Sequence, residues 1–309
     1  MTWAMVFPGQ GSQSVGMVDA LALEFPEVRQ TFDAASNVLG WDLWELVHTG
    51  PEAQLNETVN TQPALLAADV ACYRAWRAAG GSDPQFMAGH SLGEYAALVC
   101  AGSLTFAAAV GLVRTRGQLM QAAVPANTGA MAAVLGLDDA EVVRLCAEAA
   151  QGEVVEAVNF NSPGQVVIAG NAAAVARAGA LARTAGAKRV LPLAVSVPSH
   201  SSLMLAAAGR LRTVLDQVAF EAPRLPILHN AHLQTETSAP GIRAALTRQL
   251  HAPVQWTDTI RGLTAAGVTR VLECGPGKVL TGLVRRIDPA LQTFQAGEPA
   301  ALRAASLAA

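Results

Sequence analysis

Short apolar runs alternate with helical patterns along most of the chain, and this alternation limits the folds that it can adopt. Residues 4–7 and 86–88 are apolar runs of strand length, and turn-forming residues follow each of them. Residues 63–77 and 106–123 carry the apolar spacing of helices. Strands that alternate with helices in this way predict an α/β fold built on a parallel sheet.

The middle of the chain has a different rhythm. The pattern there predicts, in order, a strand at 131–135, a helix at 138–150, strands at 154–160 and 165–169, a helix at 175–184 and a strand at 189–193. This βαββαβ order is typical of a ferredoxin-like unit. We therefore expect residues 128–194 to form a small domain inserted into a larger α/β domain of residues 1–127 and 195–309.

The segment after the insertion returns to the first pattern. Its predicted elements are a helix at 202–218, a strand at 225–228, helices near 242–250 and 257–266, and a strand at 268–273. The last residues, 299–309, are small and weakly patterned, so we expect a frayed tail.

Composition excludes several classes of protein. Of the 309 residues, 51% are hydrophobic and 15% are charged, which excludes disorder and favours a sizeable core. The formal net charge of −3 and the aromatic content of 5% argue against a protein that binds nucleic acid. These values indicate a compact soluble enzyme.

The cysteines and the apolar segments indicate a cytoplasmic protein. The four cysteines lie far apart in apolar stretches without metal-binding spacing, so we expect buried reduced thiols and no metal site: Cys72, Cys100, Cys146 and Cys274. Residues 1–8 lack the features of a secretory signal. The uncharged stretch 95–113 is interrupted by Gly102-Ser103, which predicts two buried helices rather than a membrane span.

The pentapeptide Gly89-His90-Ser91-Leu92-Gly93 lies between a predicted strand and a predicted helix. A G-x-S-x-G sequence in this context is typical of a nucleophile on a sharp turn, where flanking glycines let the backbone bend tightly. Ser91 is the candidate nucleophile. The backbone amide of Leu92, at the start of the helix, can donate to a developing oxyanion.

A serine nucleophile needs a base, and His200 is the candidate among six histidines. It follows the extended run 195–199, and strand ends collect functional residues in α/β sheets; a capping or surface role is the alternative. His48, His229, His232 and His251 are expected to be surface residues, and the side chain of His90 is expected to diverge from Ser91. No acidic residue precedes His200 in a strand-end position, so a backbone carbonyl is a candidate to orient it.

Two glycine-containing loops invite a comparison with nucleotide-binding motifs. The loop Gly9-Gln10-Gly11 lacks the third glycine of a dinucleotide fingerprint, so NAD binding is rejected. The backbone amide of Gln10 is a candidate second oxyanion donor, although the loop can equally be a structural turn. The sequence Gly275-Pro276-Gly277-Lys278 lacks an earlier glycine of a phosphate loop and predicts a tight strand-to-helix turn.

Arg116 is one of two charged residues in the predicted helix 106–123, and Arg114 is the other. At ~100° per residue they lie ~200° apart, so one reaches water while the other points inward. A buried guanidinium is costly unless it is paired. Its partner is either a substrate carboxylate, held bidentately, or a distant Asp or Glu in a structural ion pair.

These features together resemble the malonyl-CoA:acyl-carrier-protein transacylase family, in its bacterial stand-alone form. The matching segments follow the family's order along nearly the whole chain, with no departure at a motif position. They are 7–13 (FPGQGSQ), 62–64 (QPA), 89–95 (GHSLGEY), 116–117 (RG), 129–131 (GAM), 159–165 (NFNSPGQ), 198–200 (PSH) and 275–278 (GPGK).

The resemblance implies a hydrolase-like α/β domain with a ferredoxin-like insertion, and it implies roles for the site residues. Ser91 would be the nucleophile, His200 the general base, and Arg116 the partner of the malonyl carboxylate. Gln249, within Arg248-Gln249-Leu250, would orient His200 through its backbone carbonyl, and the amides of Gln10 and Leu92 would form the oxyanion hole.

The implied reaction is ping-pong transfer of malonyl from coenzyme A to the phosphopantetheine thiol of acyl carrier protein, for fatty-acid synthesis. The resemblance implies a monomer, and no bound cofactor, nucleic acid or membrane is expected. An acidic carrier would dock on a local basic patch, for which Lys188 with Arg189 and Arg285 with Arg286 are candidates. The alternatives are a serine thioesterase and a transacylase of a polyketide or malonate-decarboxylating system; the preference between malonyl and methylmalonyl stays open.

Overall fold

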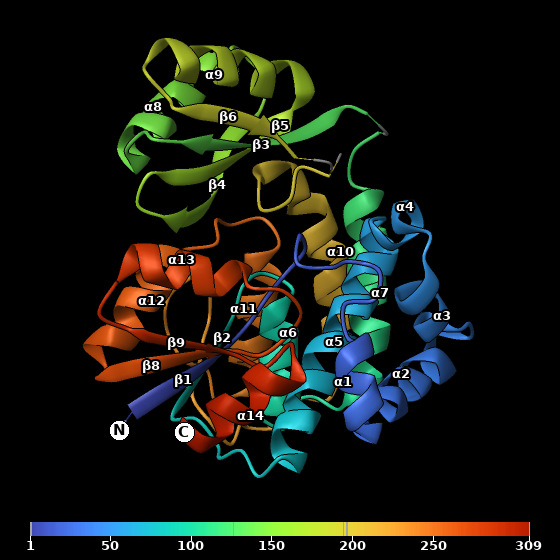
Figure 1. Cartoon of the computed structure of the whole chain (residues 1–309). Coiled ribbons are helices and arrows are strands. Elements are labelled where there is room, and N and C mark those ends of the chain that lie inside the picture. The colour runs from blue at the N-terminus through green and yellow to red at the C-terminus, as the bar shows by residue number, and fades with distance from the viewer. Residues whose placement is uncertain (1, 126, 194, 196, 309) are drawn as a thin grey trace.

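The computed structural model describes residues 2–125, 127–193, 195 and 197–308 (Figure 1). Ala194, where the expected domain boundary falls, lies outside the described residues. Ser196, in the run before His200, also lies outside them, as do Met1, Ala126 and Ala309. The described chain forms two sheets, one of five strands and one of four.

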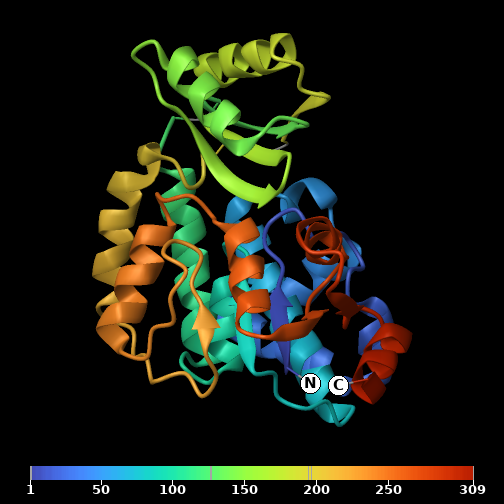
Figure 2. The same ribbon diagram turned by 90° about the vertical axis from the view of Figure 1, so that its left-hand side faces the viewer.

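The larger sheet is parallel, as the alternation of strands and helices predicts. Its strand order is β7-β2-β1-β8-β9, and each neighbouring pair is parallel. The strands are β1 (Thr2–Phe7), β2 (Phe86–Gly89), β7 (Ile227–Leu228), β8 (Val268–Glu273) and β9 (Gln292–Gln295). Because the strands are parallel, their carboxyl ends meet at one edge, and Figure 2 shows that this edge faces the smaller sheet.

Both faces of the larger sheet are buried, which follows from the alternation of side chains along β1. Met5 and Phe7 join the main core, whereas Ala4 and Val6 join a second core on the opposite face. The helices of the large unit are α1 (Asp19–Glu24), α2 (Pro26–Leu39), α3 (Leu43–Thr49), α4 (Glu52–Leu55), α5 (Thr58–Ala78), α6 (Gly93–Cys100), α7 (Phe106–Gln121), α10 (Leu205–Leu215), α11 (Ala239–Gln249), α12 (Trp256–Ala265), α13 (Val279–Ile287) and α14 (Pro299–Ala308), with a 3₁₀ turn η1 (Ser202–Met204).

The smaller sheet has the predicted ferredoxin-like topology. Its strands are antiparallel in the order β4-β5-β3-β6. Its elements are β3 (Gly129–Leu135), α8 (Asp139–Ala150), β4 (Val155–Ser162), β5 (Gln165–Asn171), α9 (Ala172–Thr184) and β6 (Arg189–Pro192). Helices α8 and α9 cover the face that points away from the large unit (Figure 1).

The other face of the smaller sheet points toward the large unit. Along β3, Ala132 and Val134 pack in the core beneath the helices, whereas Met131 and Ala133 belong to a separate apolar cluster on the opposite face. Met131 and Ala133 also line a cavity between the two sheets. The inserted sheet therefore forms one wall of the cavity.

Several elements depart from the sequence-based expectations. The expected frayed tail is wrong over 299–308, which forms α14 with Leu302 and Ala305 buried in the main core. The helix expected over 202–218 is divided into η1 and α10. Strand β9 and helices α1–α4 were not predicted; of these, α2 has readable end signals, with Pro26 at its start and Gly40 in a left-handed conformation at its end.

Other expectations are confirmed. The uncharged stretch runs from within α6 into α7, with the break at Gly102-Ser103 between them. None of the described helices combines the length and apolar character that a bilayer crossing requires. The four cysteines are buried and free.

Candidate active site

Ser91 lies on a sharp turn between β2 and α6, with a backbone φ of 51°. Close packing demands both neighbouring glycines. A Cβ on Gly89 would lie 1.9 Å from the carbonyl carbon of Gly93, and a Cβ on Gly93 would lie 2.1 Å from the carbonyl oxygen of Phe7. The turn is therefore pressed against the end of β1, and the strand-to-helix context predicted for this pentapeptide is confirmed.

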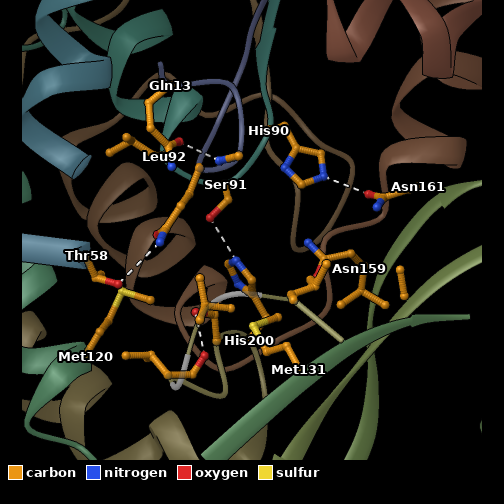
Figure 3. Close-up of a pocket in the computed structure, with 18 of the residues that line it drawn as sticks. Gln13, Thr58, His90, Ser91, Leu92, Met120, Met131, Asn159, Asn161 and His200 are labelled. Carbon is orange, nitrogen blue, oxygen red and sulfur yellow. Dashed lines mark hydrogen bonds between the residues drawn. The ribbon is translucent and has the colours of Figure 1, made fainter. Parts of the chain in front are cut away.

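His200 is brought to Ser91 from 109 residues further along the chain, and its Nε2 lies 2.8 Å from Ser91 Oγ (Figure 3). Its Nδ1 lies 2.7 Å from the backbone oxygen of Gln249. Since a carbonyl oxygen only accepts, Nδ1 carries the proton and Nε2 accepts from the Ser91 hydroxyl. Gln249 is the last residue of α11, so the partial negative charge of a helix C-terminus faces the imidazole where an acidic side chain is absent.

The environment of His200 keeps the ring neutral. Burial and the positive charge of Arg116 lower the pKa of His200 to about 3, although the bond to the Gln249 carbonyl acts in the opposite direction. At neutral pH the imidazole is therefore free to accept a proton from Ser91.

Arg116 points inward from α7, whereas Arg114 is half-buried and donates to the Leu39 carbonyl. The Arg116 side chain is 1% exposed. It donates to Gln62 Oε1 at 2.9 Å and to Gln249 Oε1 at 3.1 Å, and its Nη2 lies 3.2 Å from Ser91 Oγ.

No acidic side chain of the described chain forms an ion pair with Arg116. Its Nε has no hydrogen-bond partner among the described residues, and its guanidinium lies 5.4 Å from the ring centre of Tyr95. The expected alternative of a structural ion pair with a distant Asp or Glu is therefore wrong for the described residues.

A cavity of about 340 Å³ opens between the two sheets at this point. Ser91, His200 and Arg116 line it, as do Gln10 and Leu92, and Figure 3 shows Ser91, Leu92 and His200 together in it. The cavity thus brings together the residues singled out in the sequence, with Gln249 directly behind Arg116 and His200.

A buried polar network behind Ser91 was not predicted. Glu94 Oε1 lies 2.5 Å from His229 Nδ1, and its other oxygen accepts from the Asn230 backbone amide and from Gln249 Nε2. The Asn230 side chain accepts from the Ser91 amide at 2.8 Å and donates to the Gly89 carbonyl at 2.7 Å. Asn230 therefore holds the turn on both sides of Ser91.

The network corrects the interpretation of His229 as a surface residue, since His229 is fully buried. Burial raises the pKa of Glu94, but the charge of His229 and the hydrogen bonds from His229, Gln249 and Asn230 outweigh it and leave this pKa below its ordinary value. Two expectations of the sequence analysis are met nearby: His90 turns away from Ser91 to Asn161 (Figure 3), and the turn at Gly275 joins β8 to α13.

No cluster of three or more metal-binding side chains occurs in the part of the chain that the structure describes. The fold and the cavity define an α/β enzyme class in which a serine–histidine pair lies at a strand-to-helix turn beneath an inserted antiparallel sheet.

Comparison with known proteins narrows this class. The acyl transferase domain family matches residues 4–301. The malonyl CoA-acyl carrier protein transacylase of Escherichia coli (strain K12) is 56% identical over 303 residues, covering 98% of each chain. The chain therefore belongs to the malonyl CoA-acyl carrier protein transacylases of the acyl transferase domain family.

Solved structures agree with this placement. The malonyl CoA-acyl carrier protein transacylase from Coxiella burnetii has a TM-score of 0.98 at 48% identity, covering 99% of this chain and 97% of that chain. The structure of a type II PKS acyl carrier protein in complex with its malonyl-transacylase contains a chain that matches this one. The match has a TM-score of 0.99 at 55% identity and covers 100% of each chain. The hydrolase-like α/β fold with a ferredoxin-like insertion is thus the fold of this chain.

Proposed function

We propose that this acyltransferase moves a malonyl group from malonyl-CoA to the phosphopantetheine thiol of acyl carrier protein through a malonyl ester of Ser91. The observation that carries the substrate assignment is Arg116, a buried guanidinium that contacts no carboxylate of the described chain. A substrate that brings its own carboxylate satisfies it.

The position of Arg116 also favours a short acyl group. Its Nη2 lies 3.2 Å from Ser91 Oγ. In a malonyl thioester, a single methylene separates the carboxylate from the carbonyl that Ser91 attacks. Both ends of the group therefore fit between Ser91 and the guanidinium, whereas an acetyl group leaves the guanidinium unpaired.

The proton transfers need only Ser91 and His200. As Ser91 Oγ bonds to the thioester carbon, its proton passes to His200 Nε2; the C–S bond then breaks, and the imidazolium returns the proton to the departing thiolate. In the second half, His200 takes the proton of the carrier thiol, the thiolate attacks the ester, and Ser91 leaves with that proton. The helix C-terminus at Gln249 stabilises the transient imidazolium.

The backbone amides of Gln10 and Leu92 are the proposed oxyanion donors. Both residues line the cavity beside Ser91. The close contact of the two loops supports the pairing, since a Cβ on Gly9 would lie 2.4 Å from the carbonyl oxygen of His90. Removing one donor of this kind lowers the rate of acyl transfer by ~10²–10³-fold.

The acceptor is a holo acyl carrier protein, which we place in fatty-acid synthesis. The proposed docking surface includes Arg285 and Arg286, which are exposed at the end of α13, and Lys188 with Arg189 around β6. Arg286 donates to the side chain of Gln165, a residue that lines the cavity. An acidic carrier that contacts Arg286 would therefore be held at the cavity entrance.

The proposal extends to the organisation of the chain. The boundaries 1–127, 128–194 and 195–309 are supported by a separate core within the smaller sheet. The proposed form is a monomer, because one chain supplies every proposed catalytic group. The proposal also places the protein in the cytoplasm, without a bound cofactor or metal. Light scattering during size-exclusion chromatography tests the monomer, and a dimer that dissociates with loss of activity would contradict it.

Intact-protein mass spectrometry tests the function directly. The protein is mixed briefly with malonyl-CoA or acetyl-CoA, and holo acyl carrier protein of fatty-acid synthesis is then added. We expect a malonyl adduct that is absent from the Ser91→Ala variant and that moves to the carrier. Absence of the adduct, or loss of it to water as fast without carrier as with it, would indicate a hydrolase; a faster transfer to a polyketide carrier would reassign the acceptor.

A further inference from the structure

The side chain of Gln249 has three partners whose chemical types leave it one orientation. Its Nε2 donates to the Ser91 carbonyl at 2.8 Å and to Glu94 Oε2 at 2.9 Å. Its Oε1 accepts from Arg116 Nη2 at 3.1 Å. Carbonyl and carboxylate oxygens accept and a guanidinium only donates, so a flipped amide would lose all three bonds.

Glu94 is the partner that an amide flip would penalise most. Its carboxylate is fully buried and accepts from His229, from the Asn230 backbone and from Gln249, so every described partner is a donor. Hydrogen bonds to an ionised acceptor are stronger than neutral ones. The carboxylate therefore holds the amide nitrogen toward itself and leaves the amide oxygen facing Arg116.

We propose that Glu94 is a positioning residue for malonyl selection. It acts through the Gln249 amide, which holds the Arg116 guanidinium beside Ser91. This inference deepens the proposed function and rests on it. Glu94 is not one of the residues that line the cavity, and none of the described hydrogen bonds joins its carboxylate to Ser91 Oγ. Its effect reaches the substrate through two hydrogen bonds, from Gln249 to Glu94 and from Arg116 to Gln249.

The first experiment compares two variants of Glu94 in malonyl and acetyl loading of Ser91, measured by rapid mixing and mass spectrometry. Glu94→Met removes the acceptor, and we expect malonyl loading to fall about 10²-fold while acetyl loading falls less than about 5-fold, because displacing a substrate-positioning group by ~1 Å has an effect of this size. Glu94→Gln keeps one acceptor oxygen toward Gln249, and we expect it to retain most of the malonyl preference. An equal loss in both variants, or equal losses of malonyl and acetyl loading, would overturn the proposal.

Glu273→Met is the matched control for the loss of a buried carboxylate. Glu273 is 1% exposed, accepts from the amides of Leu280 and Thr281, and lies outside the cavity lining. We expect it to lower the melting temperature without changing the malonyl-to-acetyl ratio by more than about 2-fold. A comparable change of that ratio in the control would show that the ratio reports instability, which overturns the assignment.

A double-mutant cycle tests whether Glu94 acts through Arg116. In an Arg116→Ala background, we expect Glu94→Met to change malonyl loading by less than about 3-fold, since the group that it positions is already absent. A loss of malonyl loading of about 10²-fold in both backgrounds would mean that Glu94 acts independently of Arg116, and it would contradict the proposal. If Glu94→Met does not fold, Gln249→Met takes its place, because it removes the same link and keeps the backbone carbonyl for His200; a retained malonyl preference there would also contradict it.

A readout that needs no activity separates this inference from the proposed function. A wild-type protein that fails to load malonyl would refute the proposed function alone. In that case the crystal structure of the Glu94→Met variant, or of Gln249→Met if Glu94→Met does not fold, decides the positioning role: a displaced Arg116 guanidinium supports it, and a guanidinium that stays 3.2 Å from Ser91 Oγ, as in the wild type, overturns it.

Discussion

A buried guanidinium whose hydrogen-bond acceptors are uncharged amide and hydroxyl oxygens is electrostatically unfavourable, and a bound carboxylate relieves this cost. Arg116 has these contacts, because Gln62, Gln249 and Ser91 supply its partners. The stability of the surrounding core, which includes uncharged neighbours such as Tyr95, offsets the unfavourable free energy of this buried charge. In the proposed function, the same residue therefore provides selectivity for malonyl and lowers the stability of the free protein.

Replacing Arg116 by alanine tests this selectivity. We expect malonyl loading to fall about 10²-fold or more, because one partner of a buried charged pair is lost, while acetyl loading is spared or rises. The measurement is the loading rate of Ser91 with each thioester. Arg114→Ala, half-buried on the other face of the same helix, is the control and should change malonyl loading by less than about 2-fold. Unchanged malonyl loading in Arg116→Ala would refute the carboxylate contact.

The pH dependence of acetyl loading tests the influence of Arg116 on the pKa of His200. In the proposed mechanism His200 must be neutral to accept the serine proton. The rate therefore falls as pH falls through the pKa of His200, which burial and the charge of Arg116 lower to about 3. Arg116 contributes to that low pKa, so Arg116→Ala should raise the pKa and move the acid limb of kcat/KM to higher pH. An acid limb at the same pH in both proteins would show that Arg116 does not influence the base.

At the level of elements, local patterns predicted most of the secondary structure, and their failures have identifiable causes. The turn around Ser91 was predictable because its glycines are required by local close approach. Helix α14 was not, because its small residues have weak periodicity by themselves. It is held by packing, since Leu302 and Ala305 enter a core built by distant segments.

Helix α14 therefore gives a stability prediction. Leu302→Ala should lower the free energy of unfolding by about 2–4 kcal/mol, since Leu302 is fully buried and its loss leaves a cavity. Leu307→Ala, on the same helix but 91% exposed, should change it by no more than about 0.5 kcal/mol. Chemical denaturation of the wild type and the two variants measures both changes in the free energy of unfolding. Equal stabilities of the three proteins would support the frayed tail expected from the sequence.

Across the whole molecule, the cavity exists because two independent sheets face one another. The large unit supplies Ser91, His200 and Arg116, and the inserted sheet supplies Met131 and Ala133 as the opposite wall. Hydrogen bonds join the two units close to His200: Glu156 of β4 accepts from both the amide and the hydroxyl of Ser202. The inserted sheet thus shapes the cavity and also holds the segment that carries His200, the proposed base.

The proposed carrier-docking surface is tested by reversing the charge of Arg286. Arg286→Glu should raise the KM for holo carrier about 5–10-fold, because it places a negative charge before an acidic partner, and the effect should shrink at high salt. Loading from malonyl-pantetheine, which lacks the phosphates of coenzyme A, should be unchanged.

The control for this experiment carries the same charge change on a remote face. Arg144 is exposed on α8, which covers the outer side of the smaller sheet, and it pairs there with Glu141 and Glu148. Arg144→Glu should leave the KM for carrier unaltered. Equal effects of the two substitutions would indicate a general response to net charge rather than a docking site.

Local sequence patterns were enough to predict the fold class, the order of the inserted βαββαβ unit, the turn around Ser91 and the inward direction of one of the two arginines, Arg114 or Arg116. Each of these is expressed locally, through periodicity, glycine positions or the helical angle between two charges. Local patterns could not show that His200 lies beside Ser91, because the two residues are 109 residues apart in the sequence.

The residues that support these groups became apparent only in the folded structure. Glu94 and His229 are 135 residues apart, and neither the charge pattern nor the surroundings of His229 marks it as buried. The amide orientation of Gln249 depends on partners from three separate segments. Local patterns express backbone conformation, whereas burial and hydrogen-bond pairing between distant segments exist only after the sheets and helices have packed together.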